Sequence, residues 1–407
     1  MPPVHRWIFA LVLALSPARA GFAQDEEKPI QVFGYFQNVF QHEVFQNGPD
    51  NNSFAAQQLN LFFQKDISHR FRSFINFEFL NNFSSSEAWG AANLKEAWIR
   101  YDHSPAFKLK LGLQTPVFNH LNEIKTRTPL LPYIVRPIVY ETSLEDVIRL
   151  DEYVPERGFL QAYGTLALGR RHAFDYALFA GNSPNIRTDR NLGQTGVDTT
   201  TNVLVGGRLG VRLNEWVPRI SEIKAGVSVA TDRVNYFRDV GDMLSIKEDE
   251  IEQYRAALTM VPRTRVGVDV SVYLGRLYLE AEGISALFQV PNDLLDLHRV
   301  FGYATLGYVA SERLEFYVSY WRTDEDALIV NDAFDPTNTV VQRVTLDIPT
   351  AGVRYVANER VVFKAQIAYV DLRRAETFSD EQGIAGPTTA RTDQRLTVFA
   401  LGASVFF

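Results

Sequence analysis

The sequence predicts an all-β protein: a transmembrane, antiparallel, up-and-down β-barrel of about sixteen strands. Three observations predict this class. Apolar and polar residues alternate along most of the chain with a period of two, which is typical of strands with one apolar face. No apolar stretch of roughly 18 residues follows residue 24, so no transmembrane helix is expected. The sequence ends on an alternating segment whose last residue is Phe407.

Composition agrees with a barrel that is apolar outside and polar inside. Hydrophobic residues make up 46% of the 407 residues, yet the mean hydropathy is −0.12, because alternating strands average out. The 29 Phe and 17 Tyr residues are enough for aromatic girdles at both membrane interfaces. Since the chain has no cysteine, we expect barrel closure rather than disulfides to stabilise the fold.

The N-terminus has the features of a secretory signal peptide, residues 1–23. Two basic residues precede an apolar run that is too short to span a membrane, and small residues follow. Cleavage is expected after Ala20 or Ala23. The remaining residues, 24–407, are predicted to form a single barrel domain.

Sixteen alternating segments follow Pro29 in order. Most are roughly 8–13 residues long, close to the roughly 9–11 residues of a tilted spanning strand. The clearest has Val266 and Val268 on one face and Gly267 and Asp269 on the other. The predicted strands are 30–45, 54–65, 71–80, 94–102, 107–114, 158–168, 171–182, 202–213, 223–231, 264–274, 276–288, 298–309, 314–323, 345–355, 361–372 and 395–407. Eighteen strands stay open as an alternative, because further pairing is conceivable at residues 254–261.

Short and long connections alternate along the chain. The short ones, such as residues 68–70 and 103–105, follow even-numbered segments. The long ones follow odd-numbered segments, and the longest is residues 115–157. Transmembrane barrels alternate short turns on one side of the membrane with long loops on the other. An even strand count therefore places both termini on the side of the short turns.

Charged side chains occupy the strand phase opposite the apolar one. The apolar phase must face lipid, because an unpaired charge there is costly. A barrel of about sixteen strands is wide enough for water, so the charged phase is expected to line a polar interior. Basic residues outnumber acidic ones in this set, although many of the charges are expected only to pair across the lumen. The predicted wall residues are Arg72, Glu78, Glu96, Arg100, Lys108, Lys110, Arg208, Arg212, Lys224, Arg276, Glu280, Glu282, Arg354 and Lys364.

The third long loop, residues 115–157, is unusually apolar. It includes Leu131, Tyr133, Ile134 and Val139 between several prolines. A long apolar loop is expected to be buried or functional, so we expect it to fold into the lumen and narrow it. An external cap and a subunit contact are the alternatives. Its charged residues would then set ion preference: Glu123, Lys125, Arg127, Arg136, Glu141, Glu145, Asp146 and Arg149.

Taken together, these features resemble bacterial outer-membrane porins over the whole chain after the leader. In such barrels the C-terminal strand ends on an aromatic residue that the barrel-assembly machinery reads, as Phe407 would be here. In general porins the third outer loop folds inward and narrows the channel. The resemblance implies residence in the bacterial outer membrane, contact with lipid and lipopolysaccharide, and a homotrimer.

Two motifs resemble a narrower family, the phosphate-selective porins O and P. They are Phe33-Gly34-Tyr35-Phe36 in the first strand and the segment from Leu109 to Phe118 that enters the third loop. That family passes anions by means of lumenal arginines and a lysine cluster. The third loop of this chain has more acids than bases and lacks a dense basic cluster, so phosphate selectivity is not carried over.

Other function classes lack their sequence motifs. There is no Gly-x-Ser-x-Gly motif, so no enzyme is expected. Groups at metal-ligand spacing, nucleotide-binding loops and basic nucleic-acid patches are not evident, so neither a metal, a cofactor nor a nucleic acid is expected. The histidines are scattered over strand ends, turns and loops: His42, His69, His103, His120, His172 and His298.

Two functions stay open. The first is a water-filled channel for passive diffusion of ions and small hydrophilic solutes, in which the wall bases would favour anions. The second is a plugged or narrow barrel that serves surface attachment or adhesion through its outer loops. A channel for hydrophobic compounds would need an apolar bore, which the predicted wall charges oppose.

Overall fold

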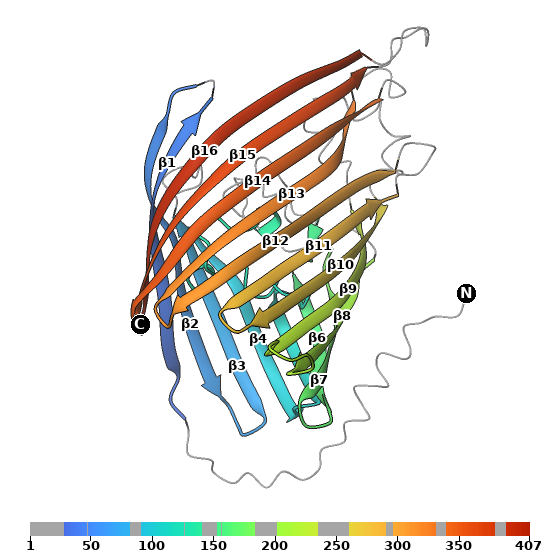
Figure 1. Ribbon diagram of the computed structural model, residues 1–407. Coiled ribbons are helices and arrows are strands. Elements are labelled where there is room, and N and C mark those ends of the chain that lie inside the picture. Colours follow the sequence, from blue (N-terminus) through green and yellow to red (C-terminus); the bar gives the residue numbers. More distant parts are fainter. Residues whose placement is uncertain are drawn as a thin grey trace, which may run out of the picture.

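A closed, antiparallel β-barrel accounts for almost all of the described chain (Figure 1). The computed structural model describes residues 28–46, 48–81, 91–125, 127–140, 153–155, 157–183, 202–234, 260–289, 296–330, 339–378 and 388–407. The predicted signal peptide lies outside these residues and stays a prediction. Within the described part of the chain, no helix is long and apolar enough to cross a membrane.

Every strand pairs with its neighbours in the sequence, and the last strand pairs with the first. The strands are β1 (Gln31–Phe45), β2 (Asn51–Asp66), β3 (Phe71–Asn81), β4 (Ala91–Ser104), β5 (Phe107–Gln114), β6 (Gly158–Leu168), β7 (His172–Gly181), β8 (Leu204–Asn214), β9 (Glu222–Val234), β10 (Val261–Leu274), β11 (Leu277–Phe288), β12 (Leu297–Ser311), β13 (Leu314–Val330), β14 (Thr339–Asn358), β15 (Val361–Phe378) and β16 (Thr388–Phe406).

Closure takes place between β1 and β16. The backbone N–H of Gly34 donates to the carbonyl of Phe407 at 3.0 Å, and the N–H of Phe407 donates to the carbonyl of Gly34 at 3.0 Å. The register continues up to Phe45, which lies opposite Leu396. Since the sheet closes on itself, it leaves no strand edge open to pairing with another chain.

The closed sheet contains sixteen strands, which decides between the two predicted counts. β9 pairs directly with β10, with Val234 opposite Val261 and Glu222 opposite Tyr273. This pairing leaves no place in the sheet for a further hairpin between them. Of the predicted extra segment, 254–261, the described residues are Met260 and Val261, and Val261 is the first residue of β10.

Several predicted strands were too short. β13 continues to Val330, where the alternation predicted an end at residue 323, and β14 to β16 also extend further toward the long loops. The apolar alternation stops at the edge of the lipid, whereas the hydrogen-bonded ladder continues beyond it. Outward-facing charges follow there instead: Arg322 donates to Asp324 at 2.8 Å, and Arg395 donates to Asp371 at 3.0 Å.

The predicted facing of the strands is confirmed. On β10, Val266 and Val268 are exposed on the outer surface, whereas Arg265 and Asp269 are buried within the barrel. The same inversion holds around the sheet, since large exposed hydrophobic residues alternate with buried polar ones. An apolar outside and a polar inside are the pattern of a transmembrane barrel of the kind found in bacterial outer membranes.

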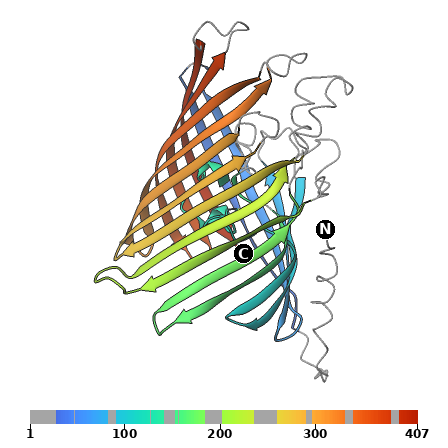
Figure 2. The same cartoon turned by 90° about the vertical axis from the view of Figure 1, so that its right-hand side faces the viewer.

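The third long loop folds into the lumen, as predicted. It forms two single-turn helices, η1 (Thr128–Leu130) and η2 (Ile138–Tyr140), which lie within the barrel in both views (Figures 1 and 2). The contacts described next join this loop to strands on opposite walls, which is possible only from the inside.

Candidate channel constriction

A bulge at the end of β5 directs the chain into the lumen. Gly112 has a φ of 116°, and a Cβ placed there would lie 2.3 Å from the carbonyl oxygen of Ala97, so only glycine fits. Asn119 follows with a φ of 52°, a conformation that asparagine tolerates better than most residues. Its backbone N–H donates to the Ser228 hydroxyl of β9 at 2.9 Å. The loop therefore crosses from β5 to the wall at β9 within a few residues.

The Glu282 carboxylate of β11 holds the start and the middle of the loop together. It accepts hydrogen bonds from the backbone N–H groups of His120 and Leu121, at 2.9 and 2.7 Å. It also accepts one from the Tyr140 hydroxyl at 2.6 Å. Because this carboxylate is buried, its charge needs such donors in place of water. Glu282 thus positions the loop and lies covered by it.

On the other wall, Gln366 of β15 binds the loop backbone. Its side-chain oxygen accepts from the N–H groups of Ile134 and Val135, at 2.7 and 2.9 Å. Its amide nitrogen donates to the Val135 carbonyl at 2.9 Å. Gln57 of β2 donates to the Ile134 carbonyl at 3.0 Å. The loop is therefore bound at both sides of the β16–β1 closure.

Lys364 of β15 is a loop anchor as well. Its ammonium group donates to the carbonyl oxygens of Thr128 and Tyr133, at 2.8 and 3.2 Å, and to the side chain of Gln37 at 3.1 Å. The lysine is 4% exposed. The sequence predicts this residue on the channel wall. Its inward direction is as predicted, but the loop covers its charge.

Apolar packing accompanies these hydrogen bonds. The Tyr133 ring contacts Tyr317 and Trp321 edge to face, with centroid distances of 5.1 and 6.1 Å, and its hydroxyl hydrogen-bonds Thr305 at 2.7 Å. Burial of one such side chain is worth about 1.5–3 kcal/mol. The loop residues in this core are Phe118, Leu121, Leu131, Tyr133, Ile138, Val139, Tyr140, Tyr153 and Val154. The burial of these side chains against the wall accounts for the apolar composition of the loop.

The loop divides the wall into two arcs. We call β9 to β16, together with β1 and β2, the clamped arc, because the anchors described above lie on it. We call β3 to β8 the open arc. The loop also packs on Phe179 and Leu204 at the outer ends of β7 and β8, but the charged residues further along these strands keep exposed surface.

Arginines of the open arc pair with acids of the same or a neighbouring strand and retain contact with water. Arg100 pairs with Asp102, two residues along β4, at 2.9 Å, and Arg72 pairs with Asp66 at 2.6 Å. Arg212 lies between two acids, at 3.6 Å from Asp175 and 3.7 Å from Glu222. The side chains of these three arginines are 35% (Arg72), 19% (Arg100) and 43% (Arg212) exposed.

Two lysines of β5 lie beside aromatic rings on this arc. The Lys108 ammonium is 6.0 Å from the centroid of the Tyr163 ring. The Lys110 ammonium is 5.6 Å from the same ring and 4.9 Å from the ring of Trp98. Further around the wall, Arg208 of β8 forms a closer pair with Asp269 of β10, at 2.6 Å.

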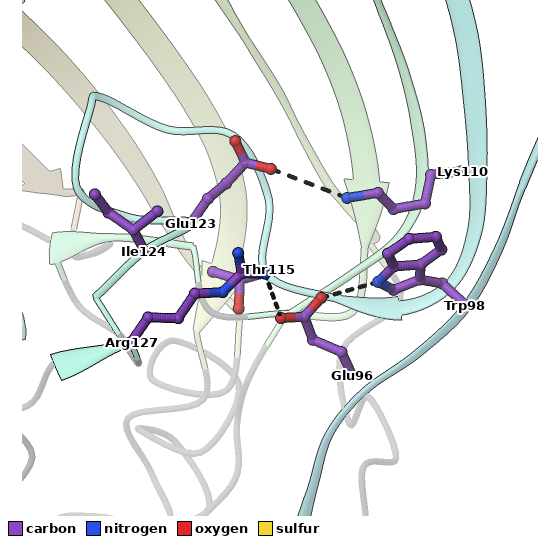
Figure 3. A pocket seen from close by; sticks show the side chains of 7 residues that line it. All are labelled: Glu96, Trp98, Lys110, Thr115, Glu123, Ile124 and Arg127. Carbon is purple, nitrogen blue, oxygen red and sulfur yellow. Dashed lines mark hydrogen bonds and ion pairs between the residues drawn. The ribbon is translucent and has the colours of Figure 1, made fainter. Parts of the chain in front are cut away.

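A pocket of about 140 Å³ lies where the loop faces β4 and β5 (Figure 3). Lys110 is 3.9 Å from Glu123 of the loop, and Arg127 of the loop is 3.6 Å from Glu96. The indole N–H of Trp98 donates to Glu96 at 2.8 Å. The lining residues are Glu96, Trp98, Lys110, Thr115, Glu123, Ile124 and Arg127. Wall and loop charges that the sequence predicts separately meet here.

Enclosure affects the ionisation of the loop carboxylate in this pocket. Desolvation within the barrel raises the pKa of Glu123 above its usual range; Lys110 opposes this shift, and Glu96 adds to it. Water still reaches the group, since 42% of its side-chain surface is exposed.

Some predicted wall residues have local partners. Glu78 is buried between Lys95, at 3.0 Å, and Gln58, which donates to it at 2.7 Å. Lys224 pairs with Glu222 of the same strand at 2.8 Å.

Three further predicted wall residues lie nearer the short turns. Arg276 lies in the turn before β11, where it donates to the Ala310 carbonyl at 3.1 Å, so it belongs to the rim. Glu280 accepts from the Tyr273 hydroxyl at 2.9 Å. Arg354 pairs with Glu315 at 3.4 Å.

The predicted loop charges divide into three groups. Glu123 and Arg127 line the pocket. Lys125 and Arg136 are buried inside the loop, where Arg136 donates to the Lys125 carbonyl. The last four lie outside the described residues and stay predictions: Glu141, Glu145, Asp146 and Arg149.

Several acids that pair with the wall arginines are absent from the residues predicted from the sequence. Asp102 stands in phase with Arg100 at the end of β4, so its alternation with the arginine could have identified it. Asp175 lies within β7, in the inward phase of that strand, and could have been identified in the same way. The others stand at or next to strand ends, where the apolar alternation is already lost and gives no phase: Asp66, Glu222 and Glu315.

Solved structures share this barrel. The anion-selective porin from Comamonas acidovorans aligns with a TM-score of 0.54 at 12% identity, covering 93% of this chain and 99% of that one. The outer-membrane channel DcaP of Acinetobacter baumannii aligns with a TM-score of 0.54 at 12% identity, covering 93% of this chain and 97% of that one. OprB of Pseudomonas putida aligns with a TM-score of 0.55 at 12% identity, covering 93% of this chain and 94% of that one.

The comparisons bear on the fold. No family model matches the chain, and no curated protein matches its sequence. The narrower resemblance to phosphate-selective porins stays a prediction. The chain therefore has the closed sixteen-stranded barrel of an outer-membrane protein, with the fold of the porins.

Proposed function

We propose that this barrel is an outer-membrane porin, through which ions and small hydrophilic solutes diffuse passively along the open arc. One observation carries the proposal: the third loop is fixed to the clamped arc, while arginines of the open arc keep water-exposed surface. A polar passage between a loop and one side of a barrel selects solutes by radius and by electrostatic barrier.

The same arc supports a preference for anions. Its inward basic residues outnumber the acidic ones on the same described strands, and Arg127 of the loop adds to them. The bases are Arg72, Arg100, Lys108, Lys110, Arg208 and Arg212; the acids are Glu78, Glu96, Asp102 and Asp175. One of the neighbours in fold is described as an anion-selective porin. The proposal assigns no catalytic chemistry to the lumen.

One observation favours the alternative of a plugged barrel for surface attachment. The loop core is extensive and reaches Ile284 and Phe301 on one side and Leu346 and Ile348 on another. A loop packed this densely leaves less room than an external loop would. The two functions make opposite predictions for conductance.

The proposal includes the partners that such a barrel requires. These are outer-membrane lipid and lipopolysaccharide on the apolar outside, and the barrel-assembly machinery at the strand that ends on Phe407. The backbone pairing of Phe407 with Gly34 supports a part for this residue in closure. A homotrimer is proposed as the assembly.

The test is single-channel current in a planar bilayer under a KCl gradient, with protein refolded from residues 24–407. The porin reading expects stepwise openings and a reversal potential with the sign of chloride preference. A reversal potential of the opposite sign would overturn the anion preference alone. The absence of openings, in barrels shown to be folded by their heat-modifiable migration, would favour the plugged barrel.

A further inference from the structure

The pocket between the loop and β4–β5 has the chemistry of a ligand site. We propose that it is a binding subsite for small carboxylates with an apolar or aromatic body, placed along the diffusion path. This inference deepens the proposed porin function and rests on it. The pocket volume of about 140 Å³ suits one small ring, since a cavity of roughly 150 Å³ holds benzene.

Two cations of the pocket lack close anionic partners. The Lys110 side chain is 10% exposed, yet its ammonium lies 3.9 Å from Glu123, beyond hydrogen-bond distance. Arg127 lies 3.6 Å from Glu96, and its Nε atom is buried with no hydrogen-bond partner among the described residues. Buried charged donors usually have partners, so both groups have capacity for an incoming acceptor.

The two carboxylates of the pocket are not equivalent. Glu96 already accepts the Trp98 indole N–H at 2.8 Å, which fixes its position on the wall. Among the described residues, Glu123 accepts no such hydrogen bond from the wall, and 42% of its side chain is exposed. A solute carboxylate can therefore replace Glu123 beside Lys110 while Glu123 turns to water. The raised pKa of Glu123 lowers its charge further in mildly acidic solution.

The apolar side chains that line the pocket would contact the apolar or aromatic body of the ligand. Trp98 is held by its bond to Glu96 and by a stack on Phe74, with ring centroids 5.0 Å apart and planes 25° apart. Ile124 of the loop lines the same pocket. Figure 3 shows Ile124 and Trp98 on opposite sides, with Lys110, Glu123 and Arg127 around the space between them. A rigid ring face with two cations suits a planar carboxylate.

Binding is tested with benzoate, benzyl alcohol and benzylamine, which share a ring and differ in charge. Isothermal titration of the refolded barrel in detergent needs no ion current. We expect benzoate to bind at least about tenfold more tightly than the other two. The variants K110Q and R127Q should each weaken benzoate at least about fivefold. Lys108→Gln changes a residue of β5 that lies outside the pocket, so it should change the dissociation constant of benzoate by less than about twofold.

A variant of the exposed loop tests the subsite even if K110Q or R127Q does not fold. Glu123→Gln removes the competing charge from the exposed loop side and should tighten benzoate about twofold to fivefold. Tighter binding of benzylamine than of benzoate would overturn the proposal, as would equal losses in K108Q and K110Q. Benzoate binding without openings in KCl would overturn the proposed porin function but support the binding subsite. Openings without benzoate binding would support the porin function and overturn the subsite.

Discussion

The clamped and open arcs differ in what satisfies their charges, although both carry inward polar residues with the same period. On the clamped arc, Glu282 and Lys364 are covered and bonded to loop backbone. On the open arc, Arg100 and Arg212 pair with neighbouring wall acids and keep exposed surface. An inward charge in a barrel can thus position a loop or line a path, and the course of the loop decides which.

The largest effect is expected from removing the loop. Replacement of residues 119–154 by a short Gly/Ser segment takes the apolar core out of the lumen, so single-channel conductance should rise severalfold and ion preference should weaken. Heat-modifiable migration of the variant checks that the barrel has closed. An unchanged conductance would mean that the loop does not narrow the path.

Loosening the clamp should have the next largest effect. Glu282→Ala removes the acceptor of three loop hydrogen bonds, so the free energy of unfolding in urea should fall by about 3 kcal/mol, and openings should become noisier. Glu280→Ala is the matched control: Glu280 is an inward acid of the same strand that accepts from Tyr273. Equal effects of the two variants would argue against a special role for Glu282.

The difference between these two glutamates also shows what sequence can predict. The sixteen strands and their facing could be predicted because alternation is a local property, as for Val266 and Asp269 on β10. The inward course of the loop followed from its apolar composition. In the sequence, Glu280 and Glu282 are the same residue type in the same phase. Which of them meets the loop depends on contacts with residues more than 140 positions away.

Ion preference should respond to the open arc more than to the clamped one. The double variant Arg100→Gln/Arg212→Gln leaves Asp102, Asp175 and Glu222 less compensated, so the reversal potential in a KCl gradient should move toward cation preference. Arg354→Gln, on the clamped arc, should give a smaller shift. A larger shift with R354Q would place the path on the other side of the lumen.

The pH dependence of selectivity should be a smaller effect. Because the pKa of Glu123 is raised by enclosure, this group loses its negative charge at a higher pH than an ordinary carboxyl as the pH falls. Its protonation leaves Lys110 uncompensated, so anion preference should increase on acidification. Reversal potentials measured between pH 7 and pH 4 check this. Glu123→Gln should remove that step; an identical profile in E123Q would assign the step to other acids.

The smallest effect is expected from a single hydroxyl of the loop core. Tyr133→Phe keeps the ring contacts with Tyr317 and Trp321 and removes the hydrogen bond to Thr305. Unfolding in urea should therefore show a loss of about 1 kcal/mol, with conductance unchanged. A large change in conductance would mean that this hydroxyl borders the path.

Cysteine accessibility tests the division of the lumen most directly, because the chain has no cysteine of its own. Single variants at Arg100 and Arg212 report on the open arc, and variants at Thr305 and Gln366 report on the clamped arc. A negatively charged methanethiosulfonate reagent should react with the first pair and reduce their single-channel current, while leaving the second pair unmodified. Equal reaction at all four positions, or reaction confined to Thr305 and Gln366, would contradict a passage along β3 to β8.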